Sequence, residues 1–164
     1  MYHALLVVGL CVAYAIFAYF FAWFFKAGPV RLSMRSAVLV ALAAVIGNAL
    51  STTVPDWQLA NRVLHIFAGG VPAYLACILA ARDAGVAAGR VRVILASALL
   101  VTALGAANEH VELALQYYWQ VRFAAGPLDT WFDLVSNTTG LVLAAIALWP
   151  FTPGPFTPAS TEKA

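Results

Sequence analysis

Five long runs of apolar residues constrain the fold of this chain more than any other feature. A helix needs about 20 mainly apolar residues to cross the hydrocarbon core of a bilayer. Runs of this length lie near residues 3–25, 36–54, 63–81, 91–116 and 129–149. None shows the in-and-out alternation that is typical of barrel strands. The sequence therefore predicts an all-α integral membrane bundle of five transmembrane helices within residues 1–150.

The composition agrees with a chain that lies mostly in lipid. Hydrophobic residues make up 63% of the 164 residues and charged residues only 10%, whereas soluble domains carry about 25% charged residues. The net charge of +2 is small, and no basic cluster with interleaved aromatic residues occurs, so we exclude nucleic acid as a partner. The first apolar run lacks the positively charged start of a secretory signal and is too long for one. We therefore expect it to be a retained span.

Lysine and arginine are distributed unevenly over the segments between and after these runs. One side of the membrane would carry Lys26, Arg31, Arg35, Arg82, Arg90, Arg92 and Lys163, and the other only Arg62 and Arg122. Because these residues favour the cytoplasmic side, the sequence predicts an external N-terminus and a cytoplasmic C-terminus. Residues 151–164 are rich in proline and should form an extended cytoplasmic tail. We expect the protein in the bacterial inner (plasma) membrane.

Acidic and amide residues gather near the predicted outer ends of the last two runs. Two glutamates three positions apart share one helix face, and two aspartates and an asparagine at intervals of four share another. A histidine begins the third span from the same side. A charge near the bilayer centre costs at least about 2.5 kcal/mol, so such groups normally face the bundle interior and are paired. The predicted polar site consists of His65, Glu109, Glu112, Asp129, Asp133 and Asn137.

Three ways of building this site stay open at this point. The candidate metal ligands are His65, Glu109, Glu112 and Asp133. Oxygen-rich ligation favours Mg²⁺, Ca²⁺ or Mn²⁺, and an imidazole draws the preference towards Zn²⁺. Alternatively, Arg122 could neutralise Glu112 or Asp129 in a structural network, and Asp129 also fits the N-cap of the fifth helix. In the third version, one carboxylate stays protonated and takes part in acid–base chemistry or proton movement.

The segment HIFAGGVPAY places Gly69, Gly70 and Pro72 inside the third predicted span. Membrane helices tolerate these residues where neighbouring helices approach closely or satisfy the freed backbone groups. The segment therefore predicts close helix packing or a kink that opens a cavity beside His65.

The segments NEHVELALQ and RFAAGPLDTWFDLVSNTTG resemble the C-terminal half of the VanZ-like membrane proteins and the related YjdF-like group. The matching positions are Glu109, Glu112, Asp129, Thr130, Asp133, Leu134, Asn137, Thr138 and Gly140, and His65 resembles a histidine of an earlier span. Gln116 follows Glu112 by four positions, whereas the VanZ pattern usually has a glutamate three before a glutamine. The resemblance covers the last two predicted spans and implies a small polytopic helical bundle of the cell envelope. That family has been linked to glycopeptide-antibiotic tolerance.

Two classes of function follow from these observations. The first is a membrane protein whose outward-facing acidic and histidine site binds a divalent metal ion or an envelope-lipid headgroup. No nucleophile with an adjacent base stands out, so catalysis is left open. The second is a non-catalytic accessory subunit of a larger membrane complex, in which a histidine could ligate a pigment or haem. Expected partners are the bilayer and either other membrane subunits or further copies of this chain. A third possibility is a carrier or proton-coupled transporter, for which a chain this small would need to form an oligomer.

Overall fold

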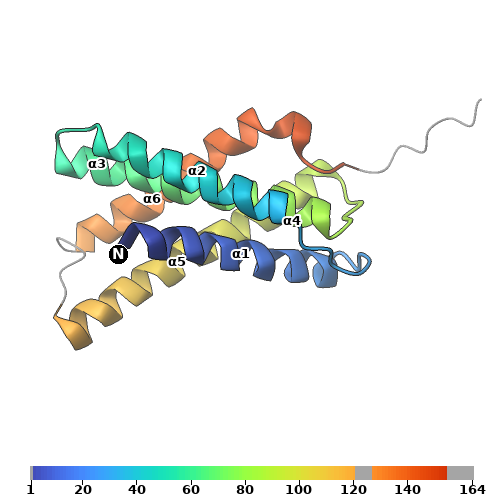
Figure 1. Cartoon of the computed structure of the whole chain (residues 1–164), viewed down its shortest axis with the longest axis horizontal. Helices are drawn as coiled ribbons and strands as arrows, with labels where there is room; N and C mark the ends of the chain where they lie inside the picture. The colour runs from blue at the N-terminus through green and yellow to red at the C-terminus, as the bar shows by residue number, and fades with distance from the viewer. Residues whose placement is uncertain (1, 121–126, 155–164) are drawn as a thin grey trace, which may run out of the picture.

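The computed structural model describes residues 2–120 and 127–154, which form a bundle of helices (Figure 1). The helices in chain order are α1 (Tyr2–Phe24), α2 (Met34–Thr52), α3 (Trp57–Leu64), the π-helical segment η1 (His65–Gly70), α4 (Val71–Asp83), α5 (Arg90–Trp119), α6 (Pro127–Ala147) and the short 3-10 turn η2 (Trp149–Phe151). Within these two ranges there is no strand. The all-α prediction is therefore confirmed.

Four helical stretches have the length and apolar character needed to cross a membrane. They are Ala4–Phe24, Met34–Thr52, Trp57–Asp83 and Arg90–Tyr118. The fifth predicted span corresponds to α6, which is 21 residues long and so falls within the usual range of about 17–25 residues. These helices are those expected of an integral membrane protein.

The third of these stretches, made of α3, η1 and α4, forms the centre of the bundle. In its most apolar window 61% of the residues are buried, against 28% in α2 and in α5. The surrounding helices expose large apolar side chains such as Ile16, Leu42 and Leu95. An apolar surface of this extent is unusual in a soluble monomer, but it suits contact with lipid chains.

The helix boundaries differ most from the predicted spans at the connection before the third span. We expected a non-helical joint there, with the span beginning near residue 63, but α3 begins at Trp57. Asp56 supplies its N-cap, because its Oδ1 accepts a hydrogen bond of 2.8 Å from the backbone N–H of Leu59. This segment is an amphipathic helix. Because its polar residues lower the mean hydropathy, the search for apolar runs did not include it in the third span.

The π-helical segment η1 interrupts the central helix at the glycine-rich sequence noted above. Pro72 has no N–H and its ring would collide with the carbonyl four residues earlier in a regular α-helix. The wider turn avoids this collision, and the N–H of Val71 bonds to the carbonyl of Ile66, five residues back. π-Helical turns of this kind occur frequently at functional sites.

Glycines allow two neighbouring helices to approach η1 closely. A Cβ at Gly47 on α2 would overlap the backbone carbonyl of Phe67, and one at Gly140 on α6 would overlap that of Ile66. Small residues at helix contacts are typical of packing in membranes, where backbones come close together. The prediction of close packing is therefore confirmed, and the backbone also changes to a π-helix.

A hydrogen-bonded clamp joins α1, α2 and α4 at the end of the bundle where α4 finishes. The hydroxyls of Tyr14 and Ser36 each donate a hydrogen bond of 2.6 Å to Oδ2 of Asp83. The backbone N–H of Ser33 donates to the Tyr14 hydroxyl at 2.9 Å. Three helices are thus fixed around one carboxylate.

Parts of the sequence-based predictions fall outside the described residues. Arg122 lies in the 121–126 segment, so the structure does not place it as a charge partner. Of the tail predicted for 151–164, the structure describes 151–154, where Thr152 is buried.

Candidate functional site

Three titratable side chains from three helical elements meet inside the bundle. His65 is the first residue of η1, Glu109 comes from α5 and Asp133 from α6. They are buried, with exposed fractions of 8%, 3% and 3%. One ligand atom from each lies within 4.8 Å of those of the other two. We call this group the acid–histidine triad. It brings together three of the six residues predicted for the polar site.

Two asparagines connect the triad into a chain of polar contacts. Nδ2 of Asn61 donates a hydrogen bond of 2.8 Å to Oδ1 of Asp133. Oδ2 of the same carboxylate lies 3.4 Å from Nε2 of His65, and Nδ1 of His65 lies 3.3 Å from Nδ2 of Asn137. Asn137, which the sequence also placed in the site, thus contacts the imidazole, on the side away from Asp133.

The tautomer of His65 depends on which way the Asn137 amide is turned. If the amide nitrogen of Asn137 donates to Nδ1, the imidazole proton lies on Nε2 and points to Asp133. Rotating the amide by half a turn would present Oδ1 to Nδ1 instead, which moves the proton to Nδ1 and frees Nε2 as a ligand. A second partner that fixes the tautomer in this way is typical of metal-ligating histidines.

Glu109 contributes a carboxylate oxygen that the triad does not satisfy. Its Oε1 is buried and has no hydrogen-bond partner among the described residues. A buried polar atom without a partner costs about 1–3 kcal/mol, and more if it is charged. An oxygen in this position is suited to coordinating a cation.

Glu112 and Asp129 take up different positions from the triad. Glu112 is buried one turn along α5, and its Oε1 accepts a hydrogen bond of 2.7 Å from Nδ2 of Asn108. Asp129 lies in the first turn of α6, which begins at Pro127, so it is not the N-cap that we expected. A carboxylate in the first turn still interacts favourably with the positive end of the helix dipole. Both lie close enough to Asp133 for their charges to interact with it.

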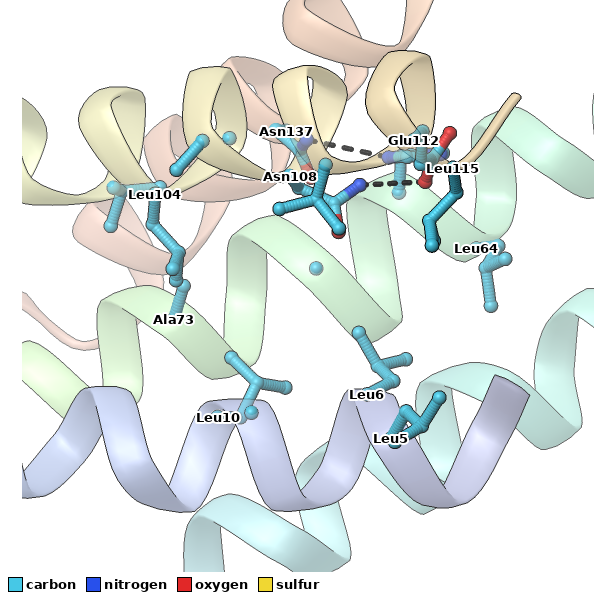
Figure 2. A pocket seen from close by; sticks show the side chains of 17 residues that line it. Leu5, Leu6, Leu10, Leu64, Ala73, Leu104, Asn108, Glu112, Leu115 and Asn137 are labelled. Atoms are coloured by element: carbon cyan, nitrogen blue, oxygen red, sulfur yellow. Dashed lines mark hydrogen bonds between the residues drawn. The ribbon is translucent and has the colours of Figure 1, made fainter. Parts of the chain in front are cut away.

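A cavity of about 440 Å³ adjoins the triad between α1 and α5. Figure 2 shows side chains of α1 along one side of it and side chains of α5 along the other, with Leu64 and Ala73 from the central helix between them. His65, Asn108, Glu112 and Asn137 are the hydrogen-bonding side chains among its lining residues. A cavity thus lies beside His65, next to the close helix packing at Gly47 and Gly140.

Sequence reasoning missed two residues that belong to this region. Asn61 was assigned to a connection, although it lies four positions before His65 and so shares its helix face. Asn108 lies four positions before Glu112, so these two residues also share one helix face. His110 points away from the triad, because it is exposed and its Nδ1 lies 2.6 Å from the carbonyl of Ala106. The i, i+4 spacing was the signal that could have identified both asparagines.

Chemically, the triad offers one imidazole and two carboxylates in a site shielded from water. This donor set can hold a divalent cation or share protons among its members. Comparison with protein-family models, with curated proteins and with solved structures finds no match to this chain. The resemblance to VanZ-like proteins therefore stays a prediction.

Proposed function

We propose that this chain is a polytopic membrane protein that binds a divalent cation at His65, Glu109 and Asp133. The observation that carries this proposal is the buried meeting of three ligand atoms within 4.8 Å of one another. The unpartnered Oε1 of Glu109 supports it independently. A cation would satisfy that oxygen and would offset the repulsion between the two carboxylates.

The donor set favours Zn²⁺ or Mn²⁺ over Mg²⁺ or Ca²⁺. Imidazole suits transition metals, whereas Mg²⁺ and Ca²⁺ prefer oxygen ligands alone. Asn61 would hold the Asp133 carboxylate and Asn137 the His65 ring, as groups behind metal ligands commonly do. Three protein ligands leave a coordination position open, as in zinc sites that bind a further molecule.

The side of the membrane that the site faces also belongs to this proposal. α1 and α6 begin, and α5 ends, at the same end of the bundle (Figure 1). Asp133 lies near the start of α6 and Glu109 in the part of α5 towards its end, so the triad lies toward that end of the bundle. The excess of Lys and Arg in the other connections supports an external position for this end. The bacterial inner membrane and kinship with the VanZ-like proteins of the cell envelope are proposed on the sequence pattern alone.

Metal content measured with a charge-matched control tests the proposal. The protein is purified in mild detergent without chelators, and bound metals are counted by inductively coupled plasma mass spectrometry. We expect about one Zn²⁺ or Mn²⁺ per chain, lost in Asp133→Asn. Asp56→Asn also removes a carboxylate, but it leaves a good N-cap on α3, so it should keep the metal.

Thermal unfolding of the same samples separates a metal site from a purely structural network. A ligand at 100 times its Kd stabilises the folded state by about 2.7 kcal/mol, so added metal should raise the Tm of the wild type but not of Asp133→Asn. Wild-type protein that neither holds nor responds to Zn²⁺ or Mn²⁺ would refute the proposal. A structural role in an accessory subunit would then remain.

A further inference from the structure

Exposed cationic side chains gather at the end of the bundle opposite the triad. At this end α1 and α4 finish, and α2 and α5 begin (Figure 1). The cations come from the α1–α2 connection and from the adjoining turns of α2, α4 and α5. They are Lys26, Arg31, Arg35, Arg82, Arg90 and Arg92. We call this group the basic cluster.

Backbone hydrogen bonds hold the α1–α2 connection against the end of α4. The N–H of Arg31 donates to the carbonyl of Asp83 at 3.3 Å. Two residues later, the N–H of Ser33 donates to the Tyr14 hydroxyl, which itself donates to the Asp83 carboxylate. Arg31 is therefore held beside the last turn of α4, which carries Arg82. Cations from separate segments thus belong to one surface.

This surface has little acid to neutralise it. Among the acidic residues that the structure describes, only Asp83 lies at this end of the bundle. Its side chain is 10% exposed and accepts the hydroxyls of Tyr14 and Ser36. Arg82 lies 3.7 Å from it, and the other five cations form no ion pair with a described residue. The basic cluster therefore presents an excess of positive charge to its surroundings.

Large apolar side chains lie on the outside of the bundle next to the basic cluster. Trp23 and Phe24, in the last turn of α1, are exposed, as are Val91 and Leu95 in the first turns of α5. Tryptophan is enriched where a membrane protein meets the lipid headgroups. Arginine and lysine lay their apolar stems along such surfaces and extend their charges to the headgroup level. The cluster thus combines a surface for acyl chains with charges at the height of lipid phosphates.

We propose that the basic cluster binds the phosphate groups of an anionic phospholipid whose acyl chains lie on the neighbouring apolar surface. Guanidinium groups bind phosphate oxygens through paired, charge-assisted hydrogen bonds. Basic pockets between membrane helices bind lipid headgroups with several negative charges. A lipid with two phosphates should therefore bind more tightly than one with a single phosphate, because arginines of separate segments offer each phosphate a partner. This goes beyond the cation site, since no residue of the triad takes part.

Lipid binding to the purified protein tests this proposal. The full-length protein is stripped of lipid in detergent and mixed with cardiolipin, phosphatidylglycerol or phosphatidylcholine, each with oleoyl chains and at the same concentration. Native mass spectrometry counts the bound lipids. We expect cardiolipin, which has two phosphates, to occupy severalfold more of the protein than phosphatidylglycerol does. Phosphatidylcholine should bind least, because its choline cancels the phosphate charge.

Variants of the basic cluster show whether the lipid binds there. Arg31→Gln combined with Arg82→Gln removes two exposed charges, so cardiolipin occupancy should fall severalfold. Arg31→Lys combined with Arg82→Lys keeps both charges and should retain most of the binding. Arg62→Gln removes a cation at the opposite end and should bind as the wild type does. The Tm in lipid-free detergent checks the folding of each variant, and Arg90→Gln with Arg92→Gln replaces the first pair if that pair does not fold.

The outcomes separate this proposal from its rivals and from the cation site. Equal occupancy by cardiolipin and phosphatidylcholine would overturn it, as would undiminished binding in a folded double glutamine variant or an equal fall in Arg62→Gln. Inorganic pyrophosphate that displaces cardiolipin at an equal concentration would show that a free anion is the ligand, and not a lipid. Asp133→Asn should bind cardiolipin as the wild type does, and the double glutamine variant should keep its metal, so each proposal can fail alone.

Discussion

Asp83 and Asp133 are bonded in ways that suit different roles. Asp83 accepts short hydrogen bonds from two hydroxyls on two other helices. Asp133 accepts one from Asn61 and faces His65, while Glu109 beside it keeps an oxygen without a partner among the described residues. A carboxylate whose bonds are supplied by hydroxyls holds helices together. One that shares a buried site with a second acid and an imidazole is poised to bind a cation.

At Asp83, we expect removal of a single hydroxyl to lower stability. Tyr14→Phe deletes the hydrogen bond to Asp83, and bonds to charged groups contribute about 1.5–3 kcal/mol. Unfolding of the purified protein in detergent should show a loss of this size in the free energy of unfolding. Tyr19→Phe, at an exposed tyrosine of the same helix, should change it by less than about 0.5 kcal/mol. Equal effects in both variants would show that the clamp contributes nothing.

Near Asp133, we expect Asn61 to tune metal affinity without supplying a ligand. Asn61→Ala removes the hydrogen bond that orients the carboxylate, and loss of such a supporting group typically costs about 10–100-fold in metal affinity. Titration of the metal-free protein with Zn²⁺ should show this drop. Gln58→Ala, on the exposed face of the same helix, should bind as the wild type does. Unchanged affinity in Asn61→Ala would place the cation away from Asp133.

At the scale of elements, the π-helical segment η1 is what brings the site together. It follows directly after α3, so its first residue, His65, stays on the helix face of Asn61 while the next turn widens. Its backbone carbonyls lie against Gly47 and Gly140, which draws α2 and α6 onto the central helix. Gly69 leaves space for Asn137, since a Cβ there would overlap the amide oxygen. The position of Asn137 against His65 thus depends on the absence of a side chain at Gly69.

This packing predicts opposite effects for two glycine substitutions. Gly47→Ala places a methyl group against the carbonyl of Phe67, and forced overpacking costs about 1–3 kcal/mol. Gly9→Ala meets open space and gains helix propensity, worth up to about 1 kcal/mol. Thermal unfolding should therefore show a lower Tm for the first variant and an equal or higher Tm for the second. A Gly47→Ala variant as stable as the wild type would show that the two helices are not in close contact.

At the scale of the whole molecule, hydropathy alone predicted the helical bundle, because each helix in lipid must be a long apolar run. The same principle placed His65, Glu109 and Asp133 inside, since charged groups avoid lipid. The hydropathy pattern could not identify α3, the helix before His65, because its polar face resembles a connection. It could not identify the π-helical segment either, because that segment depends on backbone packing with Gly47 and Gly140. Nor could it separate Glu109 from Glu112, because residues three positions apart share a helix face but can meet different neighbours.

The orientation of the bundle decides which compartment supplies the cation. Gln58 is exposed near the start of α3, and Ala87 is exposed in the connection between α4 and α5, at the opposite end of the central helix. If the excess of Lys and Arg marks the cytoplasmic side, a membrane-impermeant maleimide should label Gln58→Cys in intact cells. It should label Ala87→Cys only after permeabilisation. The unsubstituted chain sets the background, since Cys77 is fully buried and Cys11 partly so. The reverse pattern would turn the triad towards the cytoplasm. The triad depends on contacts within the bundle, so it would survive such a reversal, but the cation would then come from the cytoplasmic pool.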